Sequence, residues 1–173
     1  MDINFRPLET DDLAKIHVWF QVPEVKKWYA RDDDWALDKV KEKYLPRLQG
    51  AVNVPSFIIN LNTEEIGFIQ YYPLTEGLPE TLTAELAKEY KIDLENSAGI
   101  DLFIAREDML GKGIGVTIIN DFLKDIVPKN FHIIFVDPEV KNLRAIRAYE
   151  KCGFVKLKIT DSNKYFLMNL ERS

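Results

Sequence analysis

Gly111-Lys112-Gly113-Ile114-Gly115 places three alternating glycines directly before an apolar segment with helical spacing. Glycine lets the backbone approach a ligand closely, and the N-terminus of the following helix offers N–H groups and a positive dipole end. The pattern therefore favours a site for a phosphate or pyrophosphate group. A tight turn, with glycines present for steric reasons alone, is the structural alternative.

Two other phosphate-binding loops compete for this stretch. A P-loop ends in Gly-Lys-Ser/Thr, whereas Gly113 follows Lys112 here, so the P-loop is excluded. A dinucleotide-binding fold is the stronger rival, because Asp137 stands roughly where its ribose-binding acid would stand. That fold needs the first glycine directly after a strand, and residues 106–110 intervene in this chain. The spacing therefore disfavours it.

The composition of the 173 residues is that of an ordinary globular protein, with 46% hydrophobic and 29% charged residues. The net charge of -5 argues against nucleic acid as the main partner. Because the chain has neither a membrane-spanning apolar run nor a secretion signal, we expect a cytoplasmic protein without a membrane partner. The lone Cys152 excludes an internal disulfide, and His17 and His132 lack metal-ligand spacing, so we expect no metal.

Hydrophobic periodicity predicts helices and strands in mixed α/β order over a single domain, residues 1–173. The expected strands cover residues 3–7, 56–61, 66–73, 99–105, 132–136, 154–159 and 164–170. The expected helices cover residues 10–21, 23–29, 37–45 and 142–151, the segment from the glycines to about Pro128, and a face formed by Leu78, Leu82, Leu86 and Tyr90. We expect Pro46 to end the third helix. Residues 62–65 should form a hairpin turn.

The second half contains Asp137-Pro138, followed by Asn142-Leu143-Arg144-Ala145-Ile146-Arg147-Ala148-Tyr149-Glu150-Lys151-Cys152-Gly153-Phe154. Together with the glycine loop, this resembles the GNAT superfamily of N-acetyltransferases and, more narrowly, the aminoglycoside 6′-N-acetyltransferases. Gly99-Ile100-Asp101, Trp28-Tyr29 and Tyr44-Leu45-Pro46 resemble the narrower group as well. The resemblance covers nearly the whole chain and is weakest between Thr75 and Ser97. It implies one GNAT domain with a central mixed, mostly antiparallel sheet of six to seven strands flanked by helices.

The same resemblance implies acetyl-CoA as co-substrate. The loop that would bind its pyrophosphate comprises Leu110, Gly111, Lys112, Gly113, Ile114, Gly115 and Val116. Asn142 would contact the pantetheine arm, Ala145 belongs to the same cofactor site, and Tyr149 would lie beside the thioester sulfur. A backbone N–H near Phe103 or Ile104 would hold the oxyanion. Leu110 departs from the superfamily's usual Gln or Arg, although the aminoglycoside-modifying group also carries Leu there.

Asp101 and Tyr149 are the candidate catalytic residues. A phenol of pKa about 10 can donate a proton to a thiolate whose conjugate acid has a pKa of about 8.5. Asp101 lies on an otherwise apolar strand, where an unpaired charge would be costly. It can act as a general base, hold the acceptor ammonium, or form a structural ion pair. Tyr149 can alternatively just pack on its helix face.

The acceptor side is predicted from acidic and aromatic residues. Asp93 and Glu95 lie nearest in sequence to the strand of Asp101, which is itself a candidate contact. Trp28 and Tyr29, with the run Asp32-Asp33-Asp34, would form the opposite wall, unless the aromatics belong to the core and the acids to a solvated loop. Leu102 replaces the Gln that usually follows the strand aspartate in the aminoglycoside-modifying group.

We therefore expect an enzyme that acetylates a primary amine of a small cationic molecule, in the first place an aminoglycoside, which would make it an antibiotic-resistance protein. A polyamine, a siderophore-type hydroxylamine, lysine and a protein amine are the other candidate acceptors. A non-catalytic acyl-CoA-binding sensor is the alternative outside the enzymes. By resemblance, the protein is a monomer or a homodimer.

Overall fold

The computed structural model describes residues 2–31, 33–160 and 162–173. The chain divides into two compact units: one runs to Gln70 and includes Leu102–Lys112, and the other comprises Tyr71–Asp101 and Gly113–Ser173. The strands follow the order β1-β2-β3-β4-β5-β7-β6 in one seven-stranded sheet. Across the described residues, no helix combines the length and apolarity needed to cross a membrane.

The first unit consists of an antiparallel meander with helices inserted between its first two strands. Strand β1 pairs antiparallel with β2, and β2 pairs antiparallel with β3. The elements are β1 (Ile3–Pro7), η1 (Thr10–Asp12), α1 (Leu13–Trp19), α2 (Pro23–Trp28), α3 (Leu37–Leu48), β2 (Ser56–Leu61), the first part of β3 (Glu64–Pro73) and η3 (Glu107–Met109).

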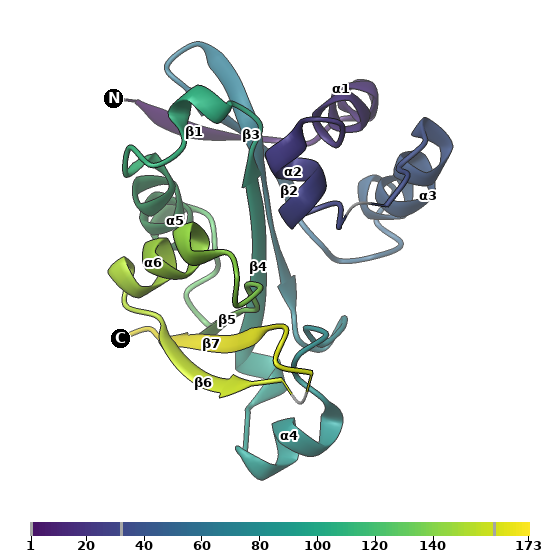
Figure 1. Cartoon of the computed structure of the whole chain (residues 1–173). Helices are drawn as coiled ribbons and strands as arrows, with labels where there is room; N and C mark the ends of the chain where they lie inside the picture. Colours follow the sequence, from purple (N-terminus) through teal and green to yellow (C-terminus); the bar gives the residue numbers. More distant parts are fainter. Residues whose placement is uncertain (1, 32, 161) are drawn as a thin grey trace. The chain divides into compact units, whose positions relative to one another are not determined.

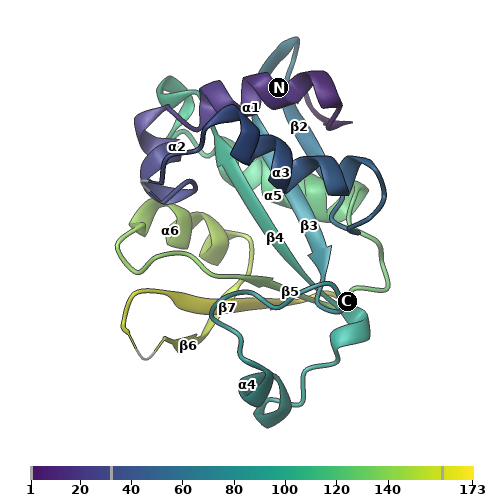
Figure 2. The same cartoon turned by 90° about the vertical axis from the view of Figure 1, so that its right-hand side faces the viewer.

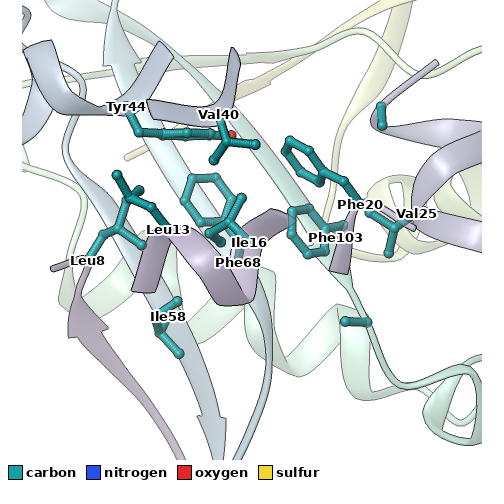
Figure 3. Packing of buried hydrophobic residues seen from close by; sticks show 12 residues of the cluster. Leu8, Leu13, Ile16, Phe20, Val25, Val40, Tyr44, Ile58, Phe68 and Phe103 are labelled. Carbon is teal, nitrogen blue, oxygen red and sulfur yellow. The ribbon is translucent and has the colours of Figure 1, made fainter. Parts of the chain in front are cut away.

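Helical spacing along α1 and α3 builds the core of this unit (Figure 3). Leu13 and Ile16 of α1 and Val40 and Tyr44 of α3 are almost fully buried. They pack with the aromatic rings of the strands, and the ring of Phe68 stacks on that of Phe103 at 5.6 Å. This aromatic packing holds α1, α2 and α3 on the strands.

A network of four charged side chains ties β1, α1 and β3 together. The guanidinium of Arg6 donates two hydrogen bonds of 2.8 Å to the carboxylate of Asp12, and a third of 2.6 Å to Glu65. Lys15 pairs with the same two acids. The Arg6 hydrogen bonds are the main cause that lowers the pKa of Asp12 to about 2.

This network predicts an acid-sensitive contribution to stability. A carboxyl whose pKa is lowered on folding stabilises the protein above its unfolded pKa and loses that effect as the pH falls through the folded pKa. Asp12→Asn should therefore lower the free energy of unfolding by about 2 kcal/mol at pH 7, and the difference should shrink between about pH 4 and pH 2. Urea unfolding of both proteins across this range is the measurement. A difference that does not depend on pH would contradict the prediction.

The second unit contains the parallel strand pair. Strands β4 and β5 pair in parallel, while β7 pairs antiparallel with both β5 and β6. The elements are the end of β3, α4 (Ala84–Glu89), η2 (Leu94–Asn96), β4 (Ser97–Ile104, whose last residues belong to the first unit), α5 (Ile114–Asp125), β5 (Ile133–Val136), α6 (Leu143–Lys151), β6 (Val155–Ile159) and β7 (Phe166–Glu171).

Helices cover both faces of these strands. Helices α5 and α6 contact one another (Figure 1). Helix α4 lies on the other side of β5 and β7 from α6 (Figure 2). There Leu82 and Ala87 join Phe135 and Leu167 in a second apolar cluster. The predicted α/β class and the mixed, mostly antiparallel sheet are confirmed.

Two expectations about helices are wrong. Pro46 does not end α3, which continues to Leu48. Proline lacks an N–H and its ring crowds the carbonyl one turn earlier, but the carbonyl of Leu45 still accepts from Gln49 at 2.9 Å, so the last turn survives. The face from Leu78 to Tyr90 is helical only from Ala84 to Glu89, because the Thr83 side chain caps α4 and Pro79 disfavours helix in the residue before it.

The other boundaries differ by a few residues. The turn after β2 is shorter than expected, because β3 already begins at Glu64. Strand β4 begins at Ser97, two residues before the expected start. The first predicted helix divides into η1 and α1, and the carboxylate of Asp12 caps the start of η1 by accepting from the N–H of Glu9 at 2.9 Å.

Candidate active site

The glycine loop turns sharply into helix α5. Gly111 and Gly113 have φ angles of 76° and 82°, a left-handed conformation that side chains other than glycine rarely adopt. Gly113 is the N-cap of the twelve-residue α5. The first N–H groups of a helix have no partner within it and carry the positive end of its dipole. The exposed loop thus presents donors to an anion.

Gly115 differs from these two glycines. A Cβ added there would meet nothing within 4 Å, and its backbone is not in the left-handed region. The fold of the free protein therefore does not require glycine at this position. A ligand that approaches the backbone would require it, and this fits the pyrophosphate of acetyl-CoA.

Helix α6 is anchored beside the start of α5. The Asn142 side chain caps α6 by accepting from the N–H of Ala145 at 3.2 Å. At the other end, the Cys152 thiol donates to the carbonyl of Val116 at 3.7 Å. Burial raises the pKa of this thiol to about 11, so it is protonated at neutral pH and is a poor nucleophile. This favours direct transfer of an acyl group over a thioester on Cys152.

Two tyrosines and two aspartates of the second unit interact electrostatically, and we call Tyr72, Asp101, Asp137 and Tyr149 the Asp–Tyr cluster. Tyr149 on α6 is only 9% exposed. Burial raises its pKa well above the usual value, and the carboxylates of Asp101 and Asp137 raise it further. The pKa of Tyr72 on β3 is raised by burial and then by the same two aspartates. Both phenols are therefore protonated at neutral pH.

Parallel pairing explains how the two aspartates come near each other. Gly99 of β4 is aligned with Phe135 of β5, and an aspartate follows each of them two residues later: Asp101 within β4 and Asp137 just after the end of β5. Two carboxylates beside the buried phenol of Tyr149 and the partly buried phenol of Tyr72 make a site of negative potential. Such a site attracts a cation and disfavours an anionic ligand.

The candidates Trp28 and Tyr29 of the first unit both take part in contacts of their aromatic rings. The ring of Tyr29 packs against that of Phe103 at 4.8 Å, within the apolar core. The ammonium of Lys27 lies over the ring of Trp28 at 4.3 Å.

The other candidates of the first unit lie at the ends of its elements. Ile104 ends β4, and Leu110 follows η3. Asp33 pairs with Lys39, whereas Asp32 lies outside the described residues.

Asp93 and Glu95 of the second unit are both exposed. The carboxylate of Asp93 caps η2, where it accepts from the backbone N–H of Glu95 at 3.2 Å and from the side chain of Asn96 at 2.8 Å. The hydrogen bond from Asn96 is the main cause that lowers the pKa of Asp93. Asp93 therefore has a local structural role.

Sequence reasoning assigned no role in the active site to Tyr72 or Asp137. The position of Asp137 directly after a buried strand parallel to that of Asp101 was a usable signal. Tyr72 is one of seven tyrosines, and no motif distinguishes it. Over the described ranges, no group of His, Cys, Asp and Glu residues could hold a metal ion.

Comparisons with known proteins agree with this geometry. Residues 9–162 match the family model of the acetyltransferase (GNAT) domain. The aminoglycoside N(6′)-acetyltransferase type 1 of Klebsiella pneumoniae is 30% identical over 165 residues, which cover 88% of this chain and 73% of the relative. The spermidine N(1)-acetyltransferase of Vibrio cholerae is 23% identical over 155 residues, or 89% of this chain and 79% of the relative.

Solved structures show the same similarity. The aminoglycoside acetyltransferase AAC(6′)-Ib in complex with ribostamycin and coenzyme A has a TM-score of 0.83 at 28% identity, covering 99% of this chain and 94% of the other. The spermidine N-acetyltransferase of Vibrio cholerae in complex with CoA and spermine has a TM-score of 0.70 at 21% identity, covering 98% and 95%, which shows the shared fold. The chain therefore belongs to the GNAT acetyltransferase family.

Proposed function

We propose that the protein transfers the acetyl group of acetyl-CoA to the 6′-amine of an aminoglycoside. The Asp–Tyr cluster carries this proposal, because it combines two carboxylates for a cationic amine with a protonated, buried phenol. The relatives support it, since those that are 28–30% identical are named as aminoglycoside acetyltransferases and include complexes with coenzyme A.

The donor site consists of the glycine loop and the first turn of α6. The backbone of residues 110–116 binds the pyrophosphate, with the N-terminal N–H groups of α5 as donors. Asn142 and Ala145 begin α6 and contact the pantetheine arm, with the side-chain oxygen of Asn142 engaged as the cap. The backbone N–H near Phe103 or Ile104, expected to hold the oxyanion, stays a prediction.

Asp101 and Tyr149 act on opposite partners of the reaction. The acceptor nitrogen forms a bond to the acetyl carbon, and the bond from that carbon to the sulfur of CoA breaks. Asp101 takes the proton that the amine loses, directly or through water, or holds the ammonium before that loss. Tyr149 donates a proton to the departing thiolate, and its phenol regains a proton from solvent. The products are the amide and free CoA.

The acceptor lies against the carboxylates of the Asp–Tyr cluster. Each amine that pairs with Asp101 or Asp137 relieves the negative potential that raises the pKa of Tyr149, so a bound polycation eases proton donation by this phenol. Four further residues stay predicted contacts of the acceptor: Trp28, Tyr29, Asp93 and Glu95. The single domain over residues 1–173, the cytoplasmic location and the monomeric or homodimeric state also stay predictions.

A thiol-release assay tests the proposed function. The purified protein is mixed with acetyl-CoA and with aminoglycosides, polyamines, lysine or a siderophore-type hydroxylamine in turn, and released CoA is measured. We expect the fastest turnover with an aminoglycoside, and NMR of the product should place the acetyl group on the 6′-nitrogen. Faster turnover with another amine would overturn the proposed acceptor. Binding of acetyl-CoA without thiol release would indicate a sensor.

Gly115→Ala tests the donor site without straining the fold. The added methyl group meets open space, and alanine within a helix is more stable than glycine by about 0.5–1 kcal/mol, so the melting temperature should hold or rise. The KM for acetyl-CoA should rise about tenfold, because the methyl group obstructs a ligand at the backbone. An unchanged KM with an unchanged melting temperature would contradict the assignment of this loop.

A further inference from the structure

The side chain of Tyr72 occupies the space above Gly99. A Cβ added at Gly99 would overlap the hydroxyl end of the Tyr72 ring. No other residue could therefore stand at position 99 without displacing this ring. Glycine at this position of β4 thus leaves the room that the hydroxyl end of Tyr72 occupies.

This position is close to the candidate catalytic aspartate. Side chains two residues apart on a strand point to the same face, about 7 Å apart, so Gly99 and Asp101 share the face on which the Tyr72 phenol lies. That separation is about the width of one sugar ring. The neighbouring Tyr71 has a different environment, because its ring lies near those of Phe122 and Phe131.

The phenol adds a donor to a cluster of acceptors. Ionised carboxylates only accept hydrogen bonds, so Asp101 and Asp137 can bind the ammonium groups of an acceptor but not a lone pair on its oxygens. The protonated phenol of Tyr72 can donate to such an oxygen. A polyamine has ammonium groups and methylenes, and it offers no oxygen to this donor.

We propose that Tyr72, held over Gly99 beside Asp101, donates a hydrogen bond to an acceptor hydroxyl next to the reacting amine and so selects amino sugars over polyamines. The inference rests on the proposed function and adds to it a residue that determines specificity. Tyr72 contacts the acceptor and takes no part in proton transfer, so its removal changes KM and leaves kcat close to that of the wild type.

The test compares two acceptors in two proteins. The acceptors are an aminoglycoside with hydroxyls at C3′ and C4′ and its 3′,4′-dideoxy analogue, and the proteins are the wild type and Tyr72→Phe. For the hydroxylated acceptor, Tyr72→Phe should raise KM about 3- to 10-fold, the usual effect of one lost hydrogen bond. For the dideoxy acceptor, the two proteins should have the same KM within about twofold. If the wild-type protein acetylates spermidine, Tyr72→Phe should also leave the KM for spermidine unchanged.

Tyr71→Phe is the matched control, because it removes the adjacent hydroxyl from the same strand and should leave both KM values unchanged. Gly99→Ala should reproduce the pattern of Tyr72→Phe by displacing the ring. If Tyr72→Phe changes KM equally for both acceptors, or changes it for neither, the inference is overturned. The proposed function still stands in that case, provided that the wild-type protein acetylates the aminoglycoside. Failure of the wild-type protein to acetylate any aminoglycoside would overturn the proposed function itself.

Discussion

Replacing Tyr149 by phenylalanine should lower kcat on the order of 100-fold, because the departing thiolate loses its proton donor. The ring of Phe keeps the packing against Phe154, whose ring centre lies 5.5 Å away, so the fold should persist. The pKa of Tyr149 is raised by burial and by Asp101 and Asp137, so this phenol stays protonated in the assay range. Steady-state kinetics with saturating acetyl-CoA and aminoglycoside measure the effect.

Two measurements separate a catalytic role of Tyr149 from a structural one. The affinity for acetyl-CoA and the melting temperature of Tyr149→Phe should stay close to those of the wild type, since only one hydroxyl is removed. A loss of kcat together with a large drop in melting temperature would indicate that Tyr149 has a structural role in packing. Wild-type kcat in the variant would contradict the assigned role.

The second large effect is expected at Asp101. Asp101→Asn keeps the size of the side chain and removes its charge, and kcat/KM for the aminoglycoside should fall on the order of 100-fold. The charge of half-buried Asp101 raises the pKa of both phenols. Its removal therefore affects both the binding of the acceptor and the pKa of Tyr149. Activity equal to that of the wild type would sink both roles proposed for Asp101.

Asp137→Asn provides the comparison that distinguishes those roles. If Asp101 takes the proton, its variant loses kcat, whereas Asp137→Asn mainly raises KM because it removes a partner of the ammonium groups. If both aspartates only hold the cation, both variants raise KM and spare kcat. If Asp101 takes the proton, the fall of kcat at low pH should disappear in Asp101→Asn and persist in Asp137→Asn.

Features encoded in contiguous residues were predicted well. The glycine loop, the helix after it and the helix expected over residues 142–151 each lie within one short segment, and local backbone chemistry decides their conformation. The strand of Asp101 was predicted from alternation to within two residues. The family was thus inferable before the fold was known.

Predictions failed where distant contacts override local patterns. Leu78 and Leu82 have the spacing of a helix, yet Leu82 is buried as part of a loop that packs on Phe135 and Leu167. Apolar periodicity predicts which residues are buried more reliably than it predicts whether they lie in a helix, a strand or a loop.

By itself, the sequence determined the family, and it predicted the donor site and two candidate reactive side chains, because each depends on neighbours along the chain. Only the tertiary structure brought Tyr72 and Asp137 to the same site. Tyr72 comes from β3 and Asp137 from the segment after β5. Asp137 comes near Asp101 because β4 pairs in parallel with β5, and Tyr72 does so because Gly99 has no side chain where the Tyr72 ring lies. Such proximity arises from long-range packing, which no local pattern records.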